Sequence, residues 1–284
     1  MTKLMALIDG SIYAQSVCDH AAWAAQRIGA SVDVLHVLGR RDVAMASTDF
    51  SGTLDAEVRD TLLAELASLD EQKSKLALRR GRLLLDEAKT RLTAAGVSDV
   101  ATKLRHGDVI ETVQEFEAGA DLIVIGKRGE AADFAKLHLG SNLERVVRAS
   151  HKPVLVASRA FRPITRFLIA FDGGTSAMKA VDYVARSPIF DGLDCRLLSA
   201  DPDTPETRKR LDDAASVLRS TGYAVQADIV SGPADAAISR RVEADGIDLL
   251  VMGAYGHSRI RSLVIGSTTT EMIRSCKVPV VLFR

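Results

Sequence analysis

Glycines and hydroxyl residues near the end of the chain are spaced in a way that suits an anionic ligand. They follow the apolar run Leu249–Met252, which is typical of a buried strand. These residues are Gly253, Gly256 and, after nine more residues, Gly266, Ser267 and Thr268. Glycines let the backbone approach a ligand closely, and Ser and Thr commonly begin a helix whose free N–H groups attract anions. The pattern therefore predicts a phosphate site.

A related pattern occurs earlier, so the chain contains an internal repeat. There the apolar run 121–125 precedes Gly126, Gly129, Gly140, Ser141 and Asn142. Asp9, Gly10 and Ser11 correspond to Asp172, Gly173 and Gly174, and Val37 corresponds to Ala200, both at an offset of 163 residues. The offset from Gly107 to Gly232 is only 125, so the first copy carries about 38 extra residues.

The elements that must position these residues alternate between strands and helices. In the first copy we expect strands over 3–8, 32–37, 101–105, 121–125 and 153–157, and helices over 16–28, 109–118 and 141–149. Continuous apolar strands indicate a parallel sheet that helices cover on both faces. Ligands bind such sheets beyond the carboxyl ends of the strands, where the strand order reverses, so the aspartate and glycine motifs are expected to face one cleft.

The length of 284 residues is sufficient for two domains, predicted at 1–158 and 165–284 with an exposed linker between them. The insertion, about 40–90, is expected to be a loop followed by a helix over 56–95. An apolar stripe on that helix is expected mainly to cover its own domain and otherwise to meet a partner. The stripe consists of Leu62, Leu66, Leu69, Leu76 and Leu83.

The composition argues against charged polymers as partners. Lys and Arg total 37, as do Asp and Glu, so neither nucleic acid nor a membrane surface is expected. Cys18, Cys195 and Cys276 are scattered singly, which predicts reduced thiols and no metal site. The first residues lead into a strand rather than a signal peptide, and no apolar run approaches the length of a membrane span, so we expect a cytoplasmic protein.

Together these motifs resemble the universal stress protein family in its tandem form. The resemblance rests on the Asp-Gly-Ser and Asp-Gly-Gly turns, the spaced glycine motif and the final strands with Lys152-Pro153-Val154 and Val278-Pro279-Val280. It covers nearly the whole chain except about residues 40–90. It implies two Rossmann-like domains of the adenine nucleotide alpha hydrolase type, each with a five-stranded parallel sheet. It further implies binding of ATP, ADP or AMP with Mg²⁺, pairing through the final strand into a homodimer, and a stress-linked sensor or adaptor with unidentified protein clients.

The resemblance also implies roles for individual residues in the second half. Asp172 would bind the adenine, Gly173 and Gly174 would admit the base and ribose, and Ala200 would pack on the base. The remaining residues would hold the ribose and phosphates or lie beside them; they are Gly253, Gly256, His257, Arg259, Arg261, Gly266, Ser267 and Thr268. For Arg259 and Arg261 a solvated loop is an equal alternative.

The first half departs from this pattern. Ten residues rather than nine separate Gly129 from Gly140, and Glu130 and Asp133 place carboxylates near the expected phosphate. Lys127, Arg128 or Lys136 would have to offset them. We therefore expect weaker binding at its candidate residues, which are Asp9, Gly10, Ser11, Val37, Gly126, Gly129, Gly140, Ser141 and Asn142.

Catalytic motifs are absent from the sequence. It has no phosphate loop, metalloprotease motif or nucleophile elbow, and His257 lacks an acidic partner at a catalytic spacing. We therefore predict a binding protein with at most slow ATP hydrolysis. Two alternatives stay open: an interaction protein that needs no nucleotide, and an adenylating or ATP-hydrolysing enzyme of a related fold. The turn 171–176 matches the loop of ATP pyrophosphatases only faintly.

Overall fold

The computed structural model describes residues 2–39, 56–129, 141–254 and 267–284. The strands are β1 (Lys3–Leu7), β2 (Ser31–Leu38), β3 (Val100–His106), β4 (Leu122–Gly126), β5 (Val154–Ala157), β6 (Arg166–Ala170), β7 (Asp194–Ser199), β8 (Val225–Ile229), β9 (Leu249–Gly253) and β10 (Val280–Phe283). The helices are α1 (Ala14–Ile28), α3 (Ala56–Ala94), α4 (Val109–Glu117), α5 (Ser141–Ala149), α6 (Thr175–Arg186), the 3₁₀ turn η2 (Pro188–Phe190), α7 (Pro205–Ser220), α8 (Ala234–Ala244) and α9 (Ser267–Ser275). In the first half they agree closely with the predicted elements.

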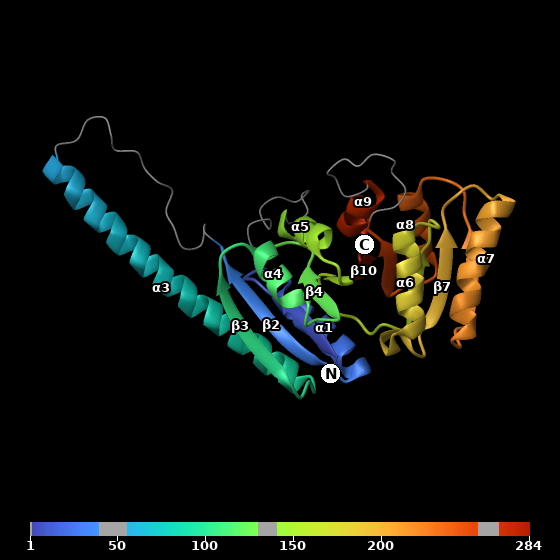
Figure 1. Cartoon of the computed structure of the whole chain (residues 1–284), viewed down its shortest axis with the longest axis horizontal. Coiled ribbons are helices and arrows are strands. Elements are labelled where there is room, and N and C mark those ends of the chain that lie inside the picture. Colours follow the sequence, from blue (N-terminus) through green and yellow to red (C-terminus); the bar gives the residue numbers. More distant parts are fainter. Residues whose placement is uncertain (1, 40–55, 130–140, 255–266) are drawn as a thin grey trace.

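All ten strands form one sheet in the order β3-β2-β1-β4-β5-β10-β9-β6-β7-β8. Each half of the chain supplies five neighbouring strands, which are parallel to one another. The second half repeats the order of the first, and the two halves lie side by side in Figure 1. The predicted fold class, two tandem parallel α/β units, is confirmed.

The two halves join through their last strands. β10 pairs antiparallel with β5, with Val280 opposite Val156 and Leu282 opposite Val154. This contact uses the edge strand of each half, so neither edge is left exposed to other chains at this point. Pairing through the final strand therefore occurs within one chain, and a homodimer would need a different surface.

Apolar residues alternate between the two faces of the sheet. Leu4 and Ala6 of β1 belong to one buried core together with Phe167 and Ile169 of β6, under α1, α6 and α7. Met5 and Leu168 belong to the core on the opposite face, under α4, α5, α8 and α9. Both cores run across the β5–β10 junction, because period-two alternation continues through the antiparallel pair.

Contacts outside the sheet fix the end of the first half and the connecting segment, and one of them reaches the second half. The Ser16 hydroxyl in α1 donates to the carbonyl of Ser158 at 2.7 Å. The His20 ring packs edge-on against Phe161 in the connecting segment, with 5.1 Å between ring centroids. The Arg27 guanidinium at the end of α1 donates to the backbone around η2.

The helix of the insertion, α3, has 39 residues and begins and ends as predicted, within one residue. Its last third packs on the sheet through Leu85, Ala88 and Leu92, all buried. The predicted stripe does not cover its own domain as expected. Leu69, Leu76 and Leu83 are 50%, 66% and 61% exposed, because the buried face of α3 lies on another side and because the helix continues beyond the sheet (Figure 1).

The cysteines agree with the prediction of free thiols. Cys18, Cys195 and Cys276 are buried and unpaired by disulfides. Although α3 is long, neither it nor any other described helix has the apolar stretch that a membrane-spanning helix requires.

Candidate functional site

Each half has a switch point in its strand order. In the first half β1 lies between β2 and β4, and in the second half β6 lies between β7 and β9. On the two sides of β1, and likewise of β6, the connections to the neighbouring strands run in opposite directions. This opens a crevice at the carboxyl ends of the strands. Asp9 follows β1, Gly126 ends β4, and Val37 lies near the end of β2. The topology therefore brings the separated motifs of each half to one edge.

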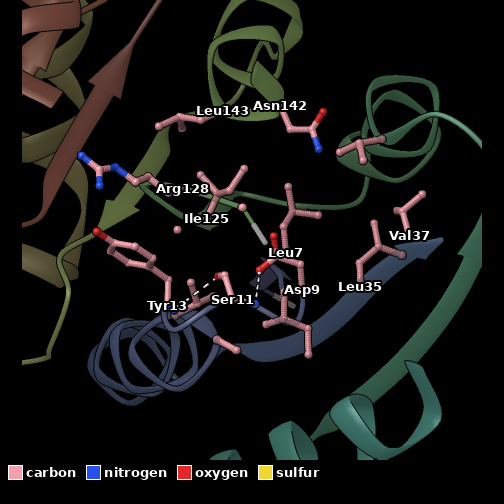
Figure 2. Close-up of a pocket in the computed structure, with 16 residues that line it drawn as sticks. Leu7, Asp9, Ser11, Tyr13, Leu35, Val37, Ile125, Arg128, Asn142 and Leu143 are labelled. Atoms are coloured by element: carbon pink, nitrogen blue, oxygen red, sulfur yellow. Dashed lines mark hydrogen bonds between the residues drawn. The ribbon is translucent and has the colours of Figure 1, made fainter. Parts of the chain in front are cut away.

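The first-half residues line a pocket that Figure 2 shows in close-up. The turn after β1 is held by its own side chains: the Ser11 N–H donates to Asp9 Oδ1 at 3.0 Å, and the Tyr13 N–H donates to Ser11 Oγ at 3.3 Å. Of the predicted residues, those that line the pocket are Asp9, Ser11, Val37, Gly126, Gly129 and Asn142. Gly10 lies in the same turn without lining the pocket, and Gly140 lies outside the described residues, as does the side chain of Ser141.

Arg128, which was expected to offset the nearby carboxylates, also lines the pocket. The other lining residues were not predicted; they are Leu7, Ile8, Tyr13, Ala14, Val17, Leu35, Val109, Ile125 and Leu143. Most are apolar, which suits a flat hydrophobic group such as a base, with Asp9 and Asn142 at hand for its polar edge. Apolar strand ends next to a predicted switch point could have indicated this lining in advance.

Two glycines in this half allow close packing around the pocket. A Cβ on Gly126 would lie 2.7 Å from the Cβ of Tyr13, and a Cβ on Gly129 would lie 2.8 Å from Asp9 Oδ2. Gly126 therefore lets α1 approach β4. Gly129 lets the loop after β4 lie against the carboxylate of Asp9.

The pocket has a volume of about 80 Å³, compared with roughly 300 to 1000 Å³ for sites that enclose a drug-sized ligand. Its lining fits the base of a nucleotide better than the whole molecule. Ribose and phosphates would have to extend towards the loop after Gly129 and the start of α5.

In the second half the turn after β6 repeats the hydrogen bonding of the turn after β1. The Gly174 N–H donates to Asp172 Oδ1 at 2.8 Å, as Ser11 does to Asp9. Gly173 has φ +72°, a conformation that favours glycine. Ala200 follows β7 and is half-buried, so it lies at the same sheet edge as Asp172.

Arg210 is a cation beside the second-half turn that sequence reasoning missed. A Cβ on Gly173 would lie 2.9 Å from Arg210 Nη1, so the guanidinium covers this turn from α7. Its Nε is buried and has no hydrogen-bond partner among the described residues. No local pattern distinguishes Arg210 from the other basic residues early in α7, because only the packing of α7 brings it to Gly173.

The glycine motif of the second half is described only in part. A Cβ on Gly253 would lie 3.1 Å from the Cβ of Ser176 and 3.2 Å from the N of Ala177, so Gly253 allows α6 to pack closely on β9. Gly256, His257, Arg259, Arg261 and Gly266 lie outside the described residues. Ser267 begins α9 and Thr268 follows it, which agrees with a helix start at this position. The ligand roles of all these residues stay predictions.

Lys127 does not serve the first-half pocket. Its Nζ donates to the backbone carbonyl of Cys276 in the second half, and the side chain is buried. Burial lowers the pKa of Lys127, since the interior disfavours the charged ammonium. Arg128 rather than Lys127 supplies the cation at the pocket.

The two histidines at the strand ends of the first half differ in their surroundings. His36 is buried in β2, and its Nδ1 donates to the carbonyl of Ile8 at 2.9 Å. His106 is exposed at the end of β3. Within the described ranges, acidic residues, His and Cys form no group able to hold a metal ion.

The strand order and the two switch points define a tandem α/β protein built on one mostly parallel sheet. The sequence model of the family described as "Universal stress protein family" matches residues 1–158 and 194–284. Universal stress protein Slr1230 of Synechocystis sp. is 37% identical over 287 residues, which cover 100% of both chains. The chain belongs to the universal stress protein family.

A solved structure agrees with this assignment at the level of the fold. A universal stress protein from Archaeoglobus fulgidus has a TM-score of 0.74 at 21% identity, covering 99% of this chain and 98% of its own. A universal stress protein in complex with cAMP covers 43% of this chain and 98% of its own, at 21% identity and a TM-score of 0.38, too low to carry its ligand over. The turn with Asp172 falls between the two segments that match the family model.

Proposed function

We propose that this universal stress protein binds an adenine nucleotide, ATP or its products ADP and AMP, mainly in the second half. The nucleotide would carry Mg²⁺ on its phosphates. Its occupancy would allow the protein to act as a sensor or adaptor in a stress response.

The observation that carries the proposal is the convergence at the switch point of the second half. β9, β6 and β7 are neighbours in the sheet, and their carboxyl ends present Gly253, Asp172 and Ala200 in that order. One oxygen of the Asp172 carboxylate accepts from the Gly174 N–H at 2.8 Å. That bond orients the carboxylate, so its second oxygen can accept from the amino group of an adenine.

Charge supports the second half over the first. Arg210 adds a guanidinium against Gly173, and the loop from Gly256 to Gly266 contains basic residues without a carboxylate. The corresponding loop of the first half contains Glu130 and Asp133. Since phosphate is recognised through cations and backbone N–H groups, carboxylates in that loop reduce its affinity.

The chemistry of the site supports binding rather than rapid turnover. Among the described residues, Asp172 bonds to a backbone N–H of its own turn and not to a histidine or hydroxyl that it could activate. We expect hydrolysis to be far below about 1 per second, the low end of common enzyme rates. Steady turnover in that range, lost in His257→Ala, would favour the enzyme alternative.

Titration calorimetry of the full-length chain with ATP, ADP and AMP at fixed salt and Mg²⁺ tests the proposal. We expect about one ATP per chain. Asp172→Asn keeps an oxygen for the Gly174 N–H but replaces the second acceptor by a donor. It should weaken ATP binding at least tenfold, a change of about 1.4 kcal/mol.

The matched control is Asp9→Asn, the same change at the equivalent position of the first half. It should leave the tight site intact, whereas Gly256→Val should remove that site by filling its space. Stronger loss of binding in Asp9→Asn than in Asp172→Asn would assign the tight site to the first half. Absence of nucleotide binding at millimolar ATP would favour the nucleotide-independent interaction protein.

A further inference from the structure

An apolar stripe runs along α3 with a constant spacing. Leu62, Leu69, Leu76 and Leu83 are seven residues apart, close to two helical turns. Leu69, Leu76 and Leu83 are each at least half exposed, and Leu62 is half-buried. Large exposed apolar residues in a row, unlike scattered ones, indicate a surface that contacts another molecule.

This stripe does not face the sheet to which α3 belongs. Residues of an α-helix are separated by about 100°, so Leu83 and Leu85 point in nearly opposite directions. Leu85 is 4% exposed against the sheet, whereas Leu83 is 61% exposed. Figure 1 shows α3 extending well beyond β2 and β3, which leaves its first half without support from the sheet. The sheet therefore does not cover the stripe.

The charges along α3 indicate which partner is complementary to its exposed stripe. From Asp60 to Gln72 the helix contains four acidic and no basic residues, and from Lys73 to Arg82 it contains five basic and no acidic residues. A helix with an acidic half and a basic half is complementary to itself when two copies run antiparallel. A parallel pair would place acid beside acid and base beside base, which is unfavourable.

We propose that α3 pairs antiparallel with α3 of a second copy of this chain. Centring the pair between Gln72 and Lys73 places Leu69 opposite Leu76 of the second copy, and Leu62 opposite its Leu83. The same register places Glu65 opposite Arg80. By symmetry each of these contacts occurs twice.

The register also accounts for the residues that interrupt the stripe. Lys73 and Arg80 lie on the same side of α3 as the leucines, where a continuous apolar seam would have leucine or isoleucine. In the antiparallel pair Arg80 meets Glu65, and Lys73 meets Gln72. Polar residues within a seam cost stability but select one register and orientation.

The size of the seam sets the expected affinity. From Leu62 to Leu83 it extends about 30 Å, at 1.5 Å per residue. A seam of this length between two single helices buries an area at the small end for specific protein interfaces, which is typical of weak contacts. We therefore expect association in the micromolar range. The dimer uses no residue of the nucleotide site, so it should form with or without ATP, and its test is independent of the proposed function.

Sedimentation equilibrium of the full-length chain between about 1 and 200 μM tests the pairing. Wild type should be in monomer–dimer equilibrium. Glu65→Arg and Arg80→Glu should each weaken self-association at least tenfold, because each places like charges opposite each other. An equimolar mixture of these two variants should recover dimerisation, since opposite charges then face each other at both ends of the mixed pair.

Arg82→Glu is the matched control, because it makes the same charge change two residues from Arg80 on another side of α3. It should dimerise like wild type, and far-ultraviolet circular dichroism should confirm unchanged helix content in all variants. A wild type that is monomeric at 200 μM overturns the proposal. So does a dimer for which Arg80→Glu and Arg82→Glu have equal effects, or a variant mixture that fails to recover association.

Discussion

The Arg27 guanidinium donates through Nε to the backbone carbonyl of Ile189, 162 residues away in the other half. A second donor of the same group, Nη2, bonds the carbonyl of Asp191. These bonds clamp the end of α1 onto η2, in addition to the antiparallel junction of β5 and β10. The two halves are thus held by side chains as well as by the shared sheet.

Arg27→Met should weaken this clamp while keeping most of the side-chain packing. Hydrogen bonds that involve a charged group contribute roughly 1.5 to 3 kcal/mol, so the free energy of unfolding should fall by about 2 kcal/mol. Urea unfolding measures the change. Arg162→Met, at an exposed position of the connecting segment, is the control and should change stability by less than about 0.5 kcal/mol. Equal stability of both variants would show that the sheet alone holds the halves together.

His20 should make the stability of the protein depend on pH. A carbonyl oxygen can only accept, so Nδ1 of His20 carries a proton and donates it to the carbonyl of Ser16 at 2.7 Å. Nε2 is buried and has no hydrogen-bond partner among the described residues. Burial lowers the pKa of His20 from 6.5, more than the Ser16 carbonyl and Asp19 raise it.

Because the folded-state pKa lies below the unfolded value, the unfolded state binds the proton first as the pH falls. The contribution of the neutral His20 ring to the free energy of unfolding is therefore fully present above about pH 6.5. It is lost as the pH falls from there towards the folded-state pKa. The loss per proton is at most about 1.4 kcal/mol per pH unit. Unfolding in urea from pH 7.5 to 5 should show a flatter dependence for His20→Asn than for wild type. His106→Asn, at an exposed position, should retain the wild-type slope.

Gly126→Ala should destabilise the chain by crowding α1 against β4. The new Cβ would lie 2.7 Å from the Cβ of Tyr13, a contact that requires the helix to shift. Overpacking of this kind costs roughly 1 to 3 kcal/mol. Gly119→Ala is the matched control, because its Cβ would meet nothing closer than 3.8 Å. Thermal unfolding of the two variants compares them directly, and similar melting temperatures would show that α1 adapts without cost.

Arg210 should contribute to nucleotide affinity in the second half. Its guanidinium lies against Gly173, beside Asp172, where it can meet an anionic or polar part of the ligand. Arg210→Met should weaken ATP binding about tenfold and reduce its salt dependence. The control is Lys209→Met at the preceding, exposed position of α7, which should bind as wild type does. Tighter binding in Arg210→Met would mean that the side chain obstructs the site.

The sequence alone determined the repeat, the order of the elements and the family. Apolar periodicity and glycine turns are local signals, and they located β1, β4 and β9 and the ends of α3 within one or two residues. They also placed Asp9 and Asp172 at strand ends. Since parallel strands have their carboxyl ends on one edge, the convergence of the motifs followed from the strand order of the fold.

The tertiary structure decided what depends on contacts between distant segments. The antiparallel joining of β5 and β10 is one such contact, because the same apolar final strands would suit pairing between two chains equally well. Arg210 reaches Gly173, and Lys127 reaches Cys276 instead of the pocket, only through the packing of helices and loops. The direction of α3 is of the same kind. Its heptad leucines and its residues Leu85, Ala88 and Leu92 are all apolar, and the position of the sheet decides which of the two faces is buried.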